Sequence, residues 1–137
     1  MRDDDFKRRI LERKNLQKTL QSRLKSLGGL AERIENSVGV GTADLACVYK
    51  QVDFWIETKI DRGKGPELDA DQKAWHTQRY LAGSRTFIAT RKAVDLDTNT
   101  FTLHRFVVGE GSWRLELRYL GQFPKVDWRA VFDSCLT

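Results

Sequence analysis

Apolar residues recur along this chain with two different periods. In some segments they recur every two residues, as in a strand, and in others they recur with the period of a helix. Residues 45–49 are apolar, residues 50–51 are polar, and residues 52–59 alternate, which predicts an antiparallel hairpin. Further strands are expected at residues 85–91, 100–108 and 113–120. The pattern therefore predicts a sheet that begins with a hairpin.

Helical periodicity predicts three helices. The first spans residues 6–25 and stops at a pair of glycines. Its apolar row consists of Phe6, Ile10, Leu16, Leu20, Leu24 and Leu27. The second covers residues 69–82 and opens with Asp69 and Gln72 at the spacing of a capping box, and the third is a short helix at 127–135.

The second strand of the hairpin has two chemically different faces. Phe54, Ile56 and Ile60 fall on one face, and Glu57 and Lys59 fall on the other, because side chains alternate along a strand. The apolar face should be buried. The opposite face presents a carboxylate beside an ammonium.

Asp44 adds a second carboxylate to this pair. It precedes the first strand of the hairpin, so antiparallel pairing should bring it beside the end of the second strand, near Glu57. Magnesium prefers oxygen ligands and keeps several waters, so two carboxylates are enough protein to hold it near a phosphate. Lys59 would orient the attacking water or stabilise the charge that develops on the phosphate. These residue types in this order favour phosphodiester hydrolysis.

The three residues belong to a longer motif that resembles the PD-(D/E)XK nuclease superfamily. The motif consists of Gly41-Thr42-Ala43-Asp44, Trp55-Ile56-Glu57-Thr58-Lys59 and a helix that opens with Asp71-Gln72-Lys73-Ala74-Trp75-His76. It is most similar to the small stand-alone phage-type members, the VRR-NUC and Holliday-junction-resolvase-like proteins, and the resemblance covers roughly residues 30–92. It implies a mixed α/β fold, in which a restriction-endonuclease-like mixed sheet is flanked by helices, with a basic amphipathic helix at the N-terminus.

The resemblance also implies roles for individual residues. Asp44 and Glu57 would be metal ligands for Mg²⁺, with Mn²⁺ able to substitute, and Lys59 would be the catalytic lysine. Gln72 would support the site from the following helix. Many members of the superfamily supply a further acid from the first helix, for which the candidate is Glu35, with Glu32 in reserve. The chain departs from the pattern at Ala43, where proline is usual, and at Thr58, where an apolar residue is common.

Each part of the motif also has a simpler interpretation. Glu57 and Lys59 could form an exposed ion pair on a solvated strand face. Gln72 could act only as the partner of Asp69 in a helix cap. The ordered combination favours the nuclease.

Positive charge is concentrated near the N-terminus. The formal net charge is +5 with a pI near 9.4, and residues 6–25 contain eight basic residues against one acid. Such a helix could lie along a DNA backbone, or it could be a solvated basic face on a helix that packs or dimerises. Candidate DNA-binding residues are Lys7, Arg8, Lys14 and Lys18 on this helix, and Arg91 and Lys92 at the mouth of the site.

Length and cysteine content place further limits on the chain. Its 137 residues indicate one nuclease domain, with the basic helix in residues 1–29, the catalytic core in 30–92 and C-terminal strands and a short helix in 93–137. Cys47 and Cys135 are typical of small apolar core residues in a reducing compartment. With no signal peptide or membrane-spanning stretch, we expect an intracellular protein in a bacterial or phage-infected cell.

The sequence thus predicts a magnesium-dependent DNA endonuclease, and the resemblance points to branched DNA such as a Holliday junction. A homodimer could place paired nicks across a junction. One alternative is a sequence-specific endonuclease of the homing or restriction type, which would need base-reading side chains. An alternative of another class is a non-catalytic DNA-binding module on the same scaffold.

Overall fold

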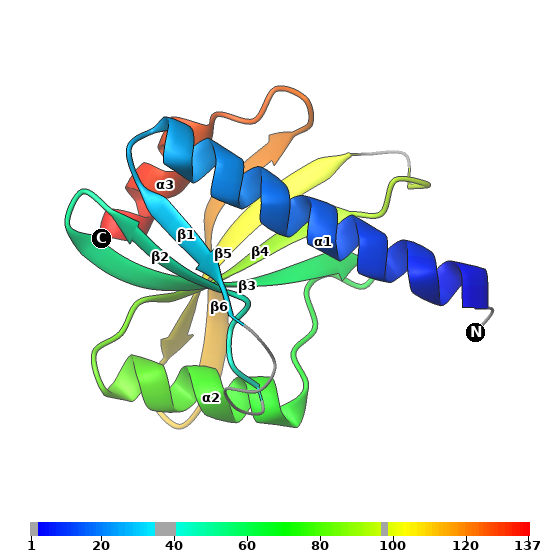
Figure 1. Cartoon of the computed structure of the whole chain (residues 1–137). Coiled ribbons are helices and arrows are strands. Elements are labelled where there is room, and N and C mark those ends of the chain that lie inside the picture. The colour runs from blue at the N-terminus through cyan, green and yellow to red at the C-terminus, as the bar shows by residue number, and fades with distance from the viewer. Residues whose placement is uncertain (1–2, 35–40, 97–98) are drawn as a thin grey trace.

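A mixed β-sheet forms the centre of the molecule, with helices on both of its faces (Figure 1). The computed structural model describes residues 3–34, 41–96 and 99–137. Within them the strands are β1 (Leu30–Arg33), β2 (Leu45–Tyr49), β3 (Val52–Asp61), β4 (Thr86–Lys92), β5 (Thr100–Val108) and β6 (Trp113–Gln122), which lie side by side in this order. The helices are α1 (Asp3–Ser26), α2 (Ala70–Leu81) and α3 (Trp128–Asp133), followed by the 3-10 turn η2 (Ser134–Leu136). The mixed α/β architecture expected from the sequence is confirmed.

The sheet is mixed, with one parallel pair of strands among antiparallel ones. Strands β3 and β4 are parallel and joined by α2, whereas the other neighbouring strands are antiparallel. The predicted hairpin is β2-β3, and its turn residues Lys50 and Gln51 have φ of 49° and 67°, as a tight two-residue turn requires. Strand β1 is not predicted by the sequence pattern, because its four residues are too few to show a period.

The two faces of the sheet carry cores of different size. Helices α1 and α3 cover one face (Figure 1), where Phe54, Ile56 and the leucines of α1 belong to the larger cluster. Helix α2 covers the other face, over a smaller cluster of Leu68, Ile88 and Phe106. The predicted apolar face of β3 is therefore buried, and the Glu57 face is covered as well.

Helix α1 packs along only part of its length. Leu16, Leu20 and Leu24 are buried, but Phe6 is 57% and Ile10 39% exposed, although both belong to the predicted apolar row. The N-terminal end of α1 extends beyond the edge of the sheet (Figure 1), which agrees with the exposure of these two side chains. No helix in the described residues is apolar over the length needed to cross a membrane.

Gly41 fixes the segment before Asp44 against α2. Its φ is +81°, and a Cβ atom built there would lie 2.3 Å from the carbonyl oxygen of Asp71. A glycine is needed both for the left-handed backbone and for the close approach to the first turn of α2. The position of Asp44 therefore depends on this contact.

His76 is buried on the inner side of α2. Its side chain is fully buried between Trp75 and Phe106, with ring centroids 5.0 and 5.2 Å away, and neither ring nitrogen hydrogen-bonds to another described group. Burial lowers the pKa of His76 to about 4, and the Lys59 ammonium acts in the same direction. The imidazole is therefore neutral at physiological pH.

We expect Gly41→Ala to destabilise the protein more than Gly63→Ala does. Both positions have positive φ, but an added Cβ at Gly63 meets nothing within 4 Å. Gly63→Ala should cost about 1–2 kcal/mol from the backbone alone, and Gly41→Ala should exceed that because α2 must also shift. Thermal unfolding of both variants measures the difference, and equal losses would mean that the contact with Asp71 does not matter.

Acidification should destabilise the wild-type protein more than a His76→Phe variant. In the unfolded chain the histidine takes up a proton below its ordinary pKa of 6.5, but folded His76 stays neutral down to about 4. The unfolded state binds more protons between these values, so stability falls as the pH is lowered through this range. Urea unfolding at pH 7 and pH 5 should show an extra wild-type loss of about 2 kcal/mol, and equal losses would contradict the assignment.

Candidate active site

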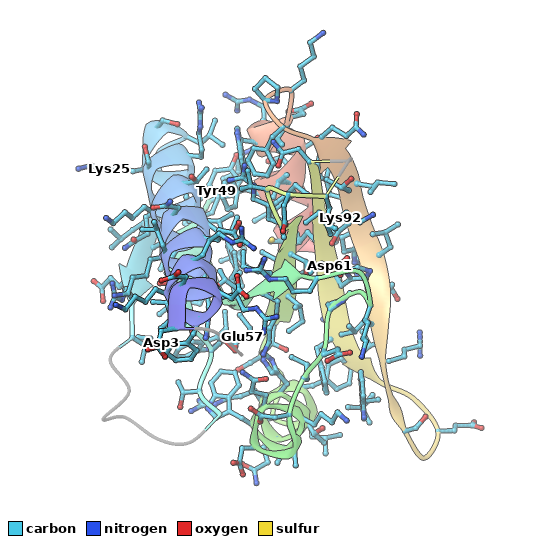
Figure 2. The ribbon with its side chains drawn as sticks, turned by 90° about the vertical axis from the view of Figure 1, so that its right-hand side faces the viewer. Asp3, Lys25, Tyr49, Glu57, Asp61 and Lys92 are labelled. Carbon is cyan, nitrogen blue, oxygen red and sulfur yellow. The ribbon has the colours of Figure 1, made fainter. Side chains whose placement is uncertain are left out.

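Four residues from three segments converge at one end of β3. Asp44 precedes β2, Glu57 and Lys59 lie on β3, and Gln72 lies in the first turn of α2. Glu57 lies between α1 and α2 (Figure 2) and is fully buried, so it is not part of a solvated strand face. The structure therefore brings together Asp44, Glu57, Lys59 and Gln72, as the sequence predicts.

Gln72 connects the two functional residues of β3 through its side-chain amide. Its Nε2 donates to Glu57 Oε2 at 2.8 Å, and its Oε1 accepts from Lys59 Nζ at 2.7 Å. The same Oε1 accepts from the backbone N–H of Asp69 at 3.1 Å, and the Asp69 carboxylate accepts from the Gln72 N–H. The capping box and the support of the site are therefore properties of one side chain.

Asp44 is held by a backbone and a side-chain donor from β3. Its Oδ2 accepts from the Thr58 N–H at 2.8 Å and from the Thr58 hydroxyl at 2.5 Å, and Gln17 Nε2 of α1 donates to that hydroxyl at 3.1 Å. Its other oxygen, Oδ1, accepts from Arg13 Nη2 at 2.6 Å. Thr58 thus serves as an anchor for Asp44 where an apolar residue would leave Oδ2 without the hydroxyl donor.

The surroundings of the two carboxyl groups shift their pKa values in opposite directions. Burial and the neighbouring Asp44 charge raise the pKa of Glu57. Burial acts to raise the pKa of Asp44 too, but the Arg13 guanidinium and the Thr58 hydrogen bonds outweigh it, and the pKa is lowered. Burial also lowers the pKa of Lys59, although the negative charge of Glu57 acts to raise it. Perturbations of this kind, clustered around one cleft, are typical of functional sites.

The acid expected from the N-terminal part of the chain is not found among the described residues. Glu35 lies outside them, and Glu32 is an exposed residue of β1. Glu12 of α1 is buried but engaged elsewhere, since its carboxylate accepts from Arg62 at 2.7 Å and from the Val94 N–H at 3.2 Å. Helix α1 instead presents Arg13 and Gln17 to the site.

The candidate DNA-binding residues have different surroundings. Lys7, Lys14 and Lys18 are exposed on α1, and Arg8 pairs with Asp95 at 3.1 Å. Lys92 of β4 lies beside Asp61 of β3 in the strand register. Asp61 and Lys59 are two residues apart on β3, so Lys92 is on the same face of the sheet as Lys59.

Arg91 does not reach the mouth of the site, contrary to the sequence-based expectation. It lies beside Ile60 in the register, on the sheet face opposite Glu57 and Lys59. Its guanidinium stacks 4.3 Å from the centroid of the Phe123 ring and its Nε donates to Asn99 at 3.1 Å. The side-chain alternation of β4 therefore assigns Arg91 to the α3 side.

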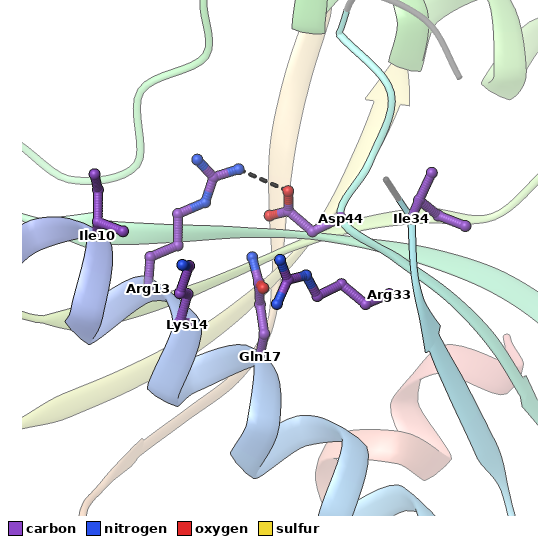
Figure 3. Close-up of a pocket in the computed structure, with 7 residues that line it drawn as sticks. All are labelled: Ile10, Arg13, Lys14, Gln17, Arg33, Ile34 and Asp44. Atoms are coloured by element: carbon purple, nitrogen blue, oxygen red, sulfur yellow. Dashed lines mark hydrogen bonds and ion pairs between the residues drawn. The ribbon is translucent and has the colours of Figure 1, made fainter. Parts of the chain in front are cut away.

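Two hollows flank α1 next to the site, and both are lined by basic side chains. Arg13, Lys14, Arg33 and Asp44 contribute to one of them (Figure 3). Arg9, Lys59, Arg62 and Lys64 contribute to the other. A polyanion could reach the carboxylates from one side and the Lys59 amine from the other.

The carboxylates form a donor set that suits a hard divalent cation. Asp44 Oδ1 and Glu57 Oε1 face the same point, which Arg13 Nη2 occupies at 2.6 and 3.7 Å from them. Glu57 Oε1 is buried and accepts no hydrogen bond from any described group. No cluster of three or more acidic, histidine or cysteine ligands exists in the described part of the chain, so a cation here would keep several waters, as Mg²⁺ commonly does.

The two cysteines of the described ranges offer no competing site. Cys47 and Cys135 are buried, unpaired thiols, and burial raises the pKa of Cys47 to about 12. Such cysteines are unreactive core residues.

Comparison with known proteins relates this fold to a nuclease. No protein-family model matches the chain, and no curated protein is found to be similar to it in sequence. Among solved structures, Hjc from the archaeal hyperthermophile Archaeoglobus fulgidus, a Holliday junction resolvase, matches with a TM-score of 0.55 over 88% of this chain and 98% of its own, at 14% sequence identity. The chain therefore shares the fold of Hjc.

Proposed function

We propose that the protein is a metal-dependent DNA endonuclease that cuts branched DNA such as Holliday junctions. The observation that carries the proposal is the convergence of Asp44, Glu57 and Lys59 at a buried, cation-lined end of β3. A DNA-binding module has no need to bury two carboxylates where a phosphate would lie, because each costs desolvation and repels the ligand.

Asp44 and Glu57 are the residues that would hold a divalent cation, with Mg²⁺ as the expected ion and Mn²⁺ as a substitute. Such an ion, when bound, makes a water molecule more acidic and neutralises charge on a phosphate. Thr58 and Gln72 keep the two carboxylates in place through the hydrogen bonds described above. Their role is to fix the donor oxygens before substrate arrives.

Lys59 is the residue proposed to act on the reacting groups. Lys59 lines the hollow that Arg9 and Arg62 also line, and its amine donates to Gln72 Oε1 of α2 at 2.7 Å. From there it can donate a hydrogen bond to the attacking water or to a phosphate oxygen as negative charge develops. Gln72 positions this amine relative to Glu57.

The branched substrate is proposed from the shared fold with Hjc, whose described activity is on Holliday junctions. A homodimer, with one site per subunit, would fit the two strands cut at a junction. The basic residues of α1 would hold the DNA backbone near the site. A site-specific endonuclease would use the same chemistry, and discrete cuts in a long linear duplex would favour it.

Glu57→Gln and Lys59→Met should abolish nicking of a synthetic four-way junction in Mg²⁺. The expected loss is at least about 10²- to 10³-fold, since each removes a group that acts in the transition state. Glu110→Gln, at an exposed carboxylate in the turn between β5 and β6, is the matched control and should nick normally. The rates come from a labelled junction with Mg²⁺ or chelator, beside a linear duplex, and wild-type cleavage by both site variants would contradict the proposal.

Neutralising the exposed lysines of α1 should weaken DNA binding without abolishing cleavage. In the triple variant Lys7→Gln, Lys14→Gln and Lys18→Gln, the slope of log affinity against log salt should fall in magnitude by up to about 3, or about 0.9 per lost phosphate contact. Arg8 is left intact because it pairs with Asp95. Lys125→Gln, at an exposed lysine near α3, is the control. Fluorescence anisotropy at several salt concentrations gives both slopes, and an unchanged slope would mean that α1 has only a structural role.

A further inference from the structure

Arg13 reaches from α1 into the centre of the candidate metal site. Its Nη2 lies 2.6 Å from Asp44 Oδ1 and 3.7 Å from Glu57 Oε1, so one cationic nitrogen is shared by the two carboxylates proposed as metal ligands. The guanidinium and a divalent cation therefore cannot both use these oxygens.

The partners in this contact differ in their freedom to move. The Arg13 side chain is 41% exposed, whereas those of Asp44 and Glu57 are 14% and 1% exposed. The carboxylates are further fixed by Thr58 and Gln72. If this contact breaks, the side chain that moves away is therefore Arg13, and the two carboxylates stay in place.

Arg13 uses only part of its hydrogen-bonding capacity in this position. A single nitrogen, Nη2, contacts the carboxylates, and its buried Nε donates to no described group. A guanidinium gains most from an anion that accepts from two of its nitrogens at once, as a phosphate does. The observed contact leaves that gain unused.

A phosphate has an entrance beside Arg13. The hollow that Arg13 lines together with Lys14 and Arg33 has a volume of about 260 Å³ and opens next to Asp44 (Figure 3). Three cationic side chains surround this entrance, so an anion bound there lies within reach of the Arg13 side chain.

We propose that Arg13 is an exchangeable counter-ion, which holds the two carboxylates in the absence of metal and moves to a DNA backbone phosphate when a divalent cation takes its place. This inference rests on the proposed function, because it assumes that Asp44 and Glu57 bind a cation beside DNA. Arg13 thereby lowers the affinity of the DNA-free protein for metal and raises the affinity of the metal-loaded protein for DNA. The site is then completed only when both ligands are present.

The first test measures Mn²⁺ binding to the full chain without DNA, by electron paramagnetic resonance of the free ion. Arg13→Gln should bind Mn²⁺ about tenfold more tightly than the wild type, since the competing cation is gone. Lys14→Gln removes one positive charge from the adjacent position and should change the affinity less than about twofold. Arg13→Lys, which keeps a single-point cation, should lie between wild type and Arg13→Gln.

The second test measures junction binding by fluorescence anisotropy, in chelator and in Ca²⁺, with the DNA checked for integrity on a gel. Arg13→Gln should weaken binding about tenfold in Ca²⁺ and less than about twofold in chelator, because Arg13 contacts the phosphate only after leaving the carboxylates. Lys14→Gln should weaken binding by the same factor in both conditions. This difference separates an exchanging residue from a static one.

Two results would overturn the inference. One is Mn²⁺ affinity in Arg13→Gln equal to or weaker than that of the wild type. The other is an equal loss of DNA affinity with and without Ca²⁺. Glu57→Gln separates this failure from that of the proposed function. If Glu57→Gln loses Mn²⁺ but Arg13→Gln does not gain affinity, only the exchange is wrong, whereas Mn²⁺ binding unaffected by Glu57→Gln removes the metal site itself.

Discussion

The structure depends on the burial of one carboxylate, Glu57, in the interface between the sheet and α2. A buried acid is tolerated only with polar partners, since the desolvation of an isolated charge is far larger than the free energy that folding provides. The amide of Gln72 supplies the nearest partner and also caps α2. The start of α2 is thereby tied to the position of Glu57, and a shift of the helix by one residue would remove both the cap and the support of the site.

Much of this arrangement could be predicted because it follows from local periodicity. Alternation along β3 separates Phe54 and Ile56 from Glu57 and Lys59, and the spacing of Asp69 and Gln72 marks the start of α2. The apolar row of α1 correctly identifies Leu16, Leu20 and Leu24 as buried. These features need only the neighbours of a residue in the sequence.

The unpredicted contacts join segments that are far apart in the chain. In a helix with many cations, the sequence does not indicate which one faces the interior, so Arg13 could not be distinguished from the exposed basic residues. Glu12 is buried because it meets Arg62, a partner 50 residues away. In the sequence Thr58 is only a departure from an apolar pattern, but its hydroxyl joins Gln17 of α1 to Asp44. Arg91 is a different case, because its position follows from side-chain alternation along β4, which is a local pattern. That alternation places Arg91 on the sheet face opposite the site, whereas the sequence-based expectation was the mouth of the site.

The uneven packing of α1 also has a consequence for local stability. The turns around Phe6 and Ile10 contact little of the protein body, while those from Leu16 to Leu24 are buried in the core. Opening the first turns exposes little additional apolar surface, so their amide protons should exchange through frequent local fraying, whereas the later turns open only with the whole domain. Arg13 lies where these two regimes meet. The helix thus delivers its functional side chain from the boundary between a segment that unfolds easily and one that does not.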